Sequence, residues 1–293
     1  MKTLFAVTSL SIACASGAFA GEVTYSNVGF GYSNLSIAGE DAGLYSYGGA
    51  LEYAQNNWVL GVSAGVASPE DLDLDLMNIS VSVAYEVMPG AYVLGGYRQV
   101  DGTFDGTSLD TETWSVGGEF TSGGFSFGLG YMYSPDANEG AYSAFANYAL
   151  DAQSDVYLAG AELLGENAVL VGVSRDTNKY SADAGYAVIA SDLDVFSVSG
   201  SYNFMPYMRV LGDVARVSLD GIDANYWGVG LGYAVAQNSW IDASYGQIKI
   251  EGETADILSL TINFETGKSK LATQKVLSNV SDLLPKPLEG VNF

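Results

Sequence analysis

The sequence predicts an all-β protein, a transmembrane antiparallel up-and-down β-barrel of about sixteen strands with a short C-terminal tail. First, segments of about ten residues alternate between large apolar and small or polar side chains, as β-strands with two different faces do. Second, no stretch has about 18 continuous apolar residues, so no membrane-spanning helix is expected. The stretch NYWGVGLGYAV (225–235) shows the alternation: Trp227, Val229, Leu231 and Tyr233 alternate with Gly228, Gly230, Gly232 and Ala234.

Strands follow one another without a linker or a change in composition, which predicts one barrel domain over residues 21–267. Each predicted strand is close to the 9–11 residues that a tilted strand needs to cross a bilayer. An even count is typical of single-chain bacterial barrels, and fourteen and eighteen strands stay open as alternatives. The expected strands are 23–37, 43–53, 58–66, 77–87, 91–100, 111–121, 125–133, 139–149, 153–162, 166–175, 179–189, 193–204, 207–217, 222–235, 238–249 and 254–265.

The first twenty residues have the pattern of a secretory signal peptide. Lys2 precedes an apolar run from Leu4 to Ala13, and the small-residue ending Ala18-Phe19-Ala20 predicts cleavage after Ala20. An alternative is a lipoprotein signal at Cys14, although Ser11 stands where such signals usually carry Leu. Cleavage after Ala20 removes Cys14, the only cysteine, so the mature chain would have no disulfide and no cysteine-bound metal.

Two faces are expected along the barrel wall. A soluble β-sandwich also alternates, but its wet face is normally rich in charged residues and Thr, whereas here it is mostly Gly, Ser and Ala. Tyr and Trp near strand ends are typical of a lipid–water boundary. Lipid is therefore expected to contact the large side chains. The predicted lipid face includes Phe30, Tyr32, Tyr47, Trp58, Leu60, Val81, Val83, Trp114, Val116, Phe127, Leu129, Val169, Val171, Leu258, Leu260 and Phe264.

The connections between strands alternate between two kinds. One kind is short and nearly neutral, such as Met88-Pro89-Gly90, and the other is acidic throughout. Because such barrels have short periplasmic turns and longer extracellular loops, the acidic set is expected outside and both termini in the periplasm. The acidic loops either keep the rim soluble or hold divalent cations that bridge to anionic lipopolysaccharide. The weak candidates for cation ligands are Glu70, Asp71, Asp73 and Asp75.

The composition argues against most kinds of active site. The chain has no His, which removes Ser/His and His/Asp mechanisms, and no phosphate-binding loop is recognisable. A formal charge of −23 makes nucleic acid an unsuitable partner, because a grip on phosphates needs a basic patch. We therefore predict no enzyme activity and no cofactor.

A channel, by contrast, needs only a wide ring, a polar wall and an electric field. The alternation places seven acidic and two basic residues on the predicted inner face. Either these acids merely wet the lumen or they enrich cations there. The candidates are Glu52, Glu86, Arg98, Glu119, Asp155, Asp183, Arg209, Asp213 and Asp242.

Together, the signal peptide, the amphipathic strands, the Met-Pro-Gly type of inner turn and the acidic loops resemble a Gram-negative outer-membrane porin. This resemblance implies a location in the outer membrane among lipid and lipopolysaccharide, passage of small polar solutes and cations, and a homotrimer. Porins usually fold a long third loop into the lumen, facing an arginine cluster. Here the matching loop, Asp101–Asp110, is short and no such cluster is visible.

The last predicted strand resembles the closing strand that the barrel-assembly machinery recognises, which usually ends the chain with an aromatic residue. Here 29 residues follow Phe264. Of these, 268–293 are expected to form either a loosely ordered periplasmic extension or a short amphipathic helix. Such a helix would occupy the lumen or touch the cell wall.

The sequence thus favours a porin for passive diffusion of ions and small polar solutes that prefers cations. The alternative is a non-transporting barrel that serves as a surface adhesin or scaffold.

Overall fold

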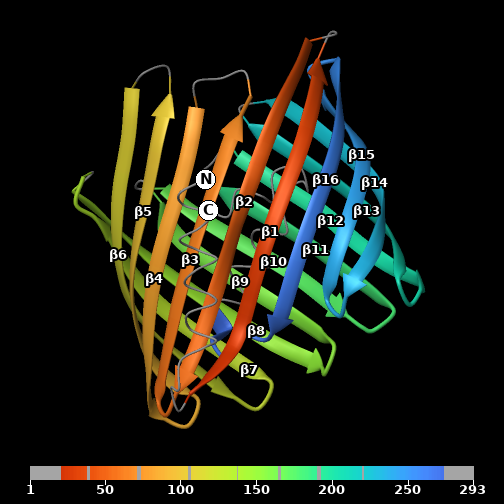
Figure 1. The fold of residues 1–293 in the computed structure, drawn as a ribbon. Helices are drawn as coiled ribbons and strands as arrows, with labels where there is room; N and C mark the ends of the chain where they lie inside the picture. The colour runs from red at the N-terminus through yellow and green to blue at the C-terminus, as the bar shows by residue number, and fades with distance from the viewer. Residues whose placement is uncertain are drawn as a thin grey trace.

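The computed structural model describes residues 21–37, 40–70, 74–104, 107–136, 138–163, 166–189, 193–219 and 221–273. Within them, sixteen strands form one closed sheet in which every neighbouring pair is antiparallel and β1 pairs with β16 (Figure 1). The predicted fold class and strand number are confirmed. The predicted signal peptide lies outside the described residues.

The strands follow each other around the barrel in chain order. They are β1 (Glu22–Ile37), β2 (Glu40–Gln55), β3 (Trp58–Pro69), β4 (Leu74–Met88), β5 (Ala91–Phe104), β6 (Thr107–Ser122), β7 (Phe125–Ser134), β8 (Glu139–Asp151), β9 (Ser154–Leu163), β10 (Glu166–Asp176), β11 (Tyr180–Ile189), β12 (Leu193–Met205), β13 (Met208–Leu219), β14 (Ile222–Ala236), β15 (Ser239–Ile250) and β16 (Glu253–Gly267).

Several strands are longer than predicted, chiefly where they approach the acidic connections. The segment Asp101–Asp110 was expected to be a loop, but its two aspartates lie opposite each other in the β5–β6 ladder. Only residues 105–106 separate these strands. The sequence prediction failed here because acidic and Gly residues suggest a loop, whereas hydrogen bonding to a long neighbour keeps the backbone extended.

The two ends of the barrel differ, and we name them by their connections. The turn end carries Gly21, Gly267 and the two- to three-residue connections that follow β2, β4, β6, β8, β10, β12 and β14; the acidic end is the opposite one. At the turn end Asn56, Gly90, Gly123 and Asn238 have φ between 54° and 78°, the left-handed conformation that tight hairpins require. The sequence marks these turns because Asn and Gly tolerate that conformation.

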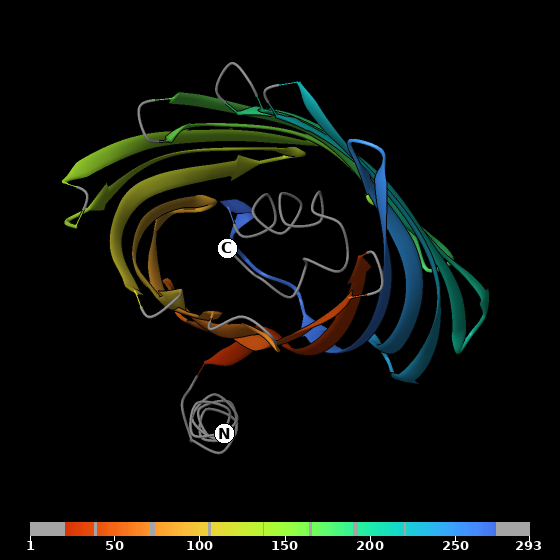
Figure 2. The same cartoon turned by 90° about the horizontal axis from the view of Figure 1, so that it is seen from above.

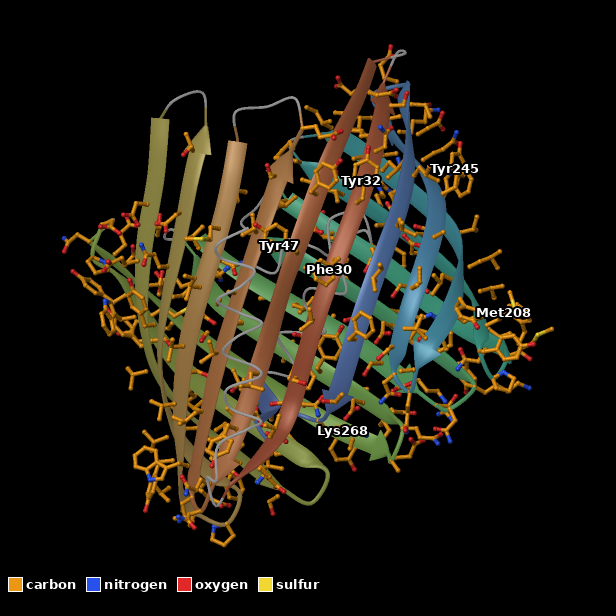
Figure 3. The ribbon with its side chains drawn as sticks, viewed as in Figure 1. Phe30, Tyr32, Tyr47, Met208, Tyr245 and Lys268 are labelled. Carbon is orange, nitrogen blue, oxygen red and sulfur yellow. The ribbon has the colours of Figure 1, made fainter. Side chains whose placement is uncertain are left out.

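The outer face carries the large apolar side chains, as predicted. Val116, Leu129 and Leu258 are each more than half exposed on the isolated chain. Phe30, Tyr32 and Tyr47 project outward from β1 and β2 in Figure 3. An aliphatic and aromatic surface of this extent is unusual on a soluble monomer and is suited to hydrocarbon.

Aromatic rings pair across strands near both ends of this face. Midway along β5 and β6, Tyr97 and Trp114 have ring centroids 4.7 Å apart. Toward the turn end, the Trp58 and Tyr85 centroids are also 4.7 Å apart. Further pairs are Tyr32–Tyr45, Tyr131–Tyr142 and Trp227–Tyr245 toward the acidic end and Phe120–Phe127 and Tyr207–Tyr233 toward the turn end. Two such bands flanking an aliphatic middle are typical of a barrel in a bilayer.

Tyrosine hydroxyls at the acidic end reach polar neighbours. The Tyr186 hydroxyl donates to Asp194 at 3.0 Å, and the Tyr245 hydroxyl donates to Asp256 at 2.6 Å. The ring of each tyrosine thus stays on the apolar wall while its hydroxyl joins the charged rim, as amphipathic side chains do at an interface.

The inner face is less bare than the sequence analysis expected. Besides Gly, Ser and Ala it carries apolar clusters that were not predicted. One cluster contains Tyr157, Leu170 and Ala187, with Phe145 and Val195 packed against it. A second contains Ala215, Tyr226 and Ile257, with Leu35 and Ile248. The inner glycines explain these rings, because a ring that lies flat on the wall needs a neighbour without a side chain.

Tyr157 is 1% exposed and covers Gly172 of the adjacent strand.

Among the described residues, no helix is long and apolar enough to cross a membrane.

We expect Gly172→Ala to destabilise the barrel by about 1–3 kcal/mol, because its methyl group would overlap the Tyr157 ring, which is packed on all sides. The measurement is the midpoint of unfolding of the detergent-refolded protein. The control is Gly29→Ala, also on the inner face, where the nearest atom would be 3.9 Å away and little change is expected. Equal midpoints for the two variants would contradict this packing.

Candidate functional site: the inner wall at the turn end

Seven acidic candidates from the sequence lie on the inner face; Asp213 lies about midway along β13, and the other six lie near the turn end. Glu52, Glu86 and Glu119 precede the ends of β2, β4 and β6 by two or three residues. Asp155, Asp183, Asp213 and Asp242 are among the first six residues of β9, β11, β13 and β15. The acids therefore surround the lumen at one end, spaced about every second strand.

On one side of the barrel, three aspartates lie in a single cross-strand row. Asp155 is paired in register with Ser174, and Ser174 with Asp183. Asp183 is then paired with Ser199, and Ser199 with Asp213. Opposed side chains on neighbouring strands lie about 5 Å apart, so this Asp/Ser row is a continuous polar track across β9–β13. Asp155 also accepts a hydrogen bond from Asn147 at 3.2 Å.

The two serines of this row were missed by the sequence analysis. The alternation assigned Asp155, Asp183 and Asp213 to one face but gave no reason to align them. Alignment follows from the tight connections between β9 and β13, which set the register of each hairpin. The sequence feature that could have predicted this alignment is the number of residues between each Asp or Ser and the turn of its hairpin.

The opposite side of the barrel carries three glutamates with different surroundings. Glu86 lies opposite Tyr92, and Tyr92 lies opposite Glu119. Glu86 accepts a hydrogen bond from the Gly90 backbone N–H at 2.9 Å and so stabilises its own turn. Glu52 and Glu119, 5% and 4% exposed, are covered by the residues that follow β16.

The two arginines of the inner face also differ. Arg209 donates two hydrogen bonds to Asp242, from Nε at 3.0 Å and from Nη2 at 2.5 Å. Its guanidinium lies 4.2 Å from the ring centroid of Trp240. Gly232 lies on β14, between Arg209 of β13 and Asp242 of β15, and its missing side chain leaves the space that this pair fills. Arg209 and Asp242 therefore neutralise each other at a fixed position on the wall.

Arg98 lies farther from the turn end, on β5 between Ser80 and Thr113. The Arg98 side chain makes no hydrogen bond or ion pair within the part of the chain that the structure describes. No arginine cluster of the kind implied by the porin resemblance forms around it.

The candidates for divalent cations lie at the acidic end. Glu70 accepts a hydrogen bond from the Tyr45 hydroxyl at 2.8 Å. Asp71, Asp73 and the side chain of Asp75 lie outside the described residues. Among the residues that are described, no three acidic, His or Cys side chains come together as a metal site would require.

Comparison with solved structures places this barrel among known folds. An engineered triple mutant of the Rhodopseudomonas blastica porin superposes with a TM-score of 0.55 at 10% identity, over 83% of this chain and 100% of that one. Pseudomonas aeruginosa OpdQ gives 0.55 at 10% identity, over 85% and 99% of the two chains. Pseudomonas aeruginosa OpdO gives 0.54 at 12% identity, over 83% and 96%.

The chain has a porin fold. No protein-family model matches its sequence. No curated protein matches it either. At these identities the likeness concerns architecture, and the resemblance to porins expected from the sequence is confirmed at that level. The porin fold here has connections at the acidic end that are much shorter than the long third loop that the resemblance implied.

Removing the charge of Asp242 should destabilise this porin-fold barrel, because Arg209 would remain on the wall without its partner. We expect Asp242→Asn to cost about 1–3 kcal/mol in the free energy of unfolding. Asp223→Asn, which breaks the exposed pair with Arg216, should cost much less, because solvent screens that pair. Urea unfolding of the refolded protein in detergent measures both variants, and a larger loss for Asp223→Asn would refute the ranking.

Proposed function

We propose that this protein is an outer-membrane porin, a water-filled channel for passive diffusion of ions and small polar solutes that prefers cations. The observation that carries the proposal is the contrast between the two faces of one closed barrel. Its outer face is apolar with aromatic bands at both ends. Its inner face carries the seven acidic candidates and the two arginine candidates, and the strand register also turns Asp176 and Glu265 inward. A sixteen-stranded ring lies in the range that leaves an aqueous passage.

Cation preference rests on the excess of acidic over basic side chains along the inner wall. Asp242 is neutralised by Arg209, whereas the Asp155–Ser174–Asp183–Ser199–Asp213 row contains no basic residue. A low-dielectric wall strengthens the field of such a row, which enriches cations and repels anions in the passage.

The orientation in the membrane follows from the connections. We place the acidic end outside the cell and the turn end, with both termini, in the periplasm, since barrels of this kind have short periplasmic turns. The rim carboxylates then face the zone of lipopolysaccharide head groups, where divalent cations would bridge the two sets of negative charge. The aromatic bands contact the lipid of the two interfaces.

By resemblance to porins, the protein assembles as a homotrimer.

Channel activity is tested by single-channel recording of the purified full-length mature protein in a planar lipid bilayer. We expect stepwise ohmic currents, because water-filled passages conduct in proportion to the applied voltage. A barrel that inserts, as judged by protease protection in vesicles, and yet remains silent would favour the adhesin or scaffold alternative.

Cation preference is tested by removing the charge of the row. The triple variant Asp155→Asn, Asp183→Asn and Asp213→Asn should move the reversal potential in a salt gradient toward zero. The control variant removes three charges at the acidic end by Asp194→Asn, Asp223→Asn and Asp256→Asn. It should change the reversal potential less than the triple variant of the row does. A wild-type reversal potential of the anion-selective sign would contradict the proposed preference.

A further inference from the structure

After β16 the chain turns into the barrel instead of away from it. Gly267 has φ +78°, and a side chain there would overlap the Thr24 carbonyl. The next residue, Lys268, donates its backbone N–H to that carbonyl at 2.7 Å. Figure 2 shows the blue segment after β16 inside the ring of strands, and Figure 3 labels Lys268 where the segment begins.

Glu52 of β2 binds the beginning of this segment. Its carboxylate accepts hydrogen bonds from the Ser269 hydroxyl at 2.5 Å and from the Lys270 backbone N–H at 2.8 Å. The Thr24 hydroxyl of β1 donates to the same carboxylate. The Lys270 ammonium lies 3.3 Å from Glu22, so a more exposed ion pair adds to the contact.

Glu119 of β6 binds the end of the described segment, four strands away from Glu52. It accepts hydrogen bonds from the backbone N–H groups of Ala272 at 3.0 Å and Thr273 at 2.9 Å. The Thr273 hydroxyl donates a third at 2.5 Å. Helical backbone begins at Ala272. The segment thus spans the inner wall from β2 to β6.

Between the two glutamates, Leu271 fills an apolar pocket of the wall. It is 4% exposed and packs with Ala54, Val59 and Ala84, beside Tyr92 and Leu94. Burial of this leucine side chain away from water favours the docked position. Leu271 thus holds the segment between the hydrogen bonds to Glu52 and those to Glu119. Together these three contacts fix the position of the segment along the wall.

The burial of the two glutamates needs this segment. A buried carboxylate is costly unless several donors bind it, and each of these carboxylates receives three hydrogen bonds. Ser269 and Lys270 donate two of the three hydrogen bonds to Glu52. Ala272 and Thr273 donate all three hydrogen bonds to Glu119. Without the segment, both carboxylates would face the lumen.

We propose that Glu52, Glu119 and the Ala54–Val59–Ala84 pocket are a docking site for residues 268–273 of the same chain. The docked segment narrows the passage and withdraws two carboxylates from the ion path. This inference rests on the proposed channel function and deepens it. Cation preference then depends on the row across β9–β13 on the other side of the lumen.

The first test compares single-channel conductance and reversal potential among five forms of the full barrel. These are the wild type, a truncation after Gly267, the double variant Glu52→Ala and Glu119→Ala, the truncation that carries this double variant, and the control Glu86→Ala. Glu86 is an inner-face glutamate at the same end whose carboxylate binds its own turn and not the segment, so it reports the effect of charge loss alone.

We expect the truncation to raise both conductance and cation preference, because it removes the segment and uncovers both carboxylates. The double variant should raise conductance without raising cation preference, because it releases the segment and removes the same two charges. Within the truncated form, the two alanine substitutions should give no further rise in conductance, since anchors without a segment have nothing to release. Glu86→Ala should not raise conductance.

A second test follows the docking itself and does not depend on channel currents. Leu271→Cys introduces a thiol at the apolar anchor, and the only native cysteine, Cys14, lies in the predicted signal peptide. We expect slow reaction with a water-soluble maleimide, and at least about tenfold faster reaction when Glu52→Ala and Glu119→Ala are added, because a tenfold change corresponds to only about 1.4 kcal/mol.

The outcomes separate the inference from the proposed function. Equal conductance steps for the wild type and the truncation, or fast labelling of Leu271→Cys in the otherwise unchanged barrel, would overturn the docked constriction and leave the porin standing. Silence of all forms, with Leu271→Cys protected, would overturn the channel function and therefore the narrowing role, while the docking contact remained.

Discussion

A sheet that closes on itself leaves no strand with unpaired backbone donors and acceptors, and here the pairing of β1 with β16 achieves that closure. Closure allows strands to lie in hydrocarbon, where an unpaired N–H or C=O costs several kcal/mol. It also fixes an inside and an outside for every residue, because side chains alternate along each strand. Each further property of the chain depends on that division.

The sequence predicts this division well because alternation is a local property. Strand number, the apolar outer face and the short turns all follow from patterns within about fifteen residues. The turns at Asn56 and Gly90 could be recognised from residues that tolerate a left-handed backbone. Strand lengths at the acidic end were less predictable, because pairing with a neighbour extends segments such as Asp101–Phe104 that are too polar to suggest a strand.

The inner wall was only partly predictable, because its chemistry depends on register between strands. Alternation placed Asp155 and Asp183 on the inner face, but only the hairpin geometry aligns them with Ser174. Likewise, the glycine opposite Tyr157 has its meaning only once the ring is seen to cover it. The sequence of a single strand determines which face of the sheet each side chain lies on, whereas a site combines side chains from several strands.

A wide barrel with very short connections has few ways to restrict its own passage. The β5–β6 connection of two residues is too short to fold into the lumen, since two extended residues span only about 7 Å. Among the described residues, the chain that follows β16 also starts at the barrel mouth, and Gly267 turns it inward. Buried carboxylates on β2 and β6 then hold it against the wall. A porin fold with short connections can thus obtain a constriction from residues 268–273, the segment that follows its last strand. This segment covers two of the acids that would otherwise act on ions.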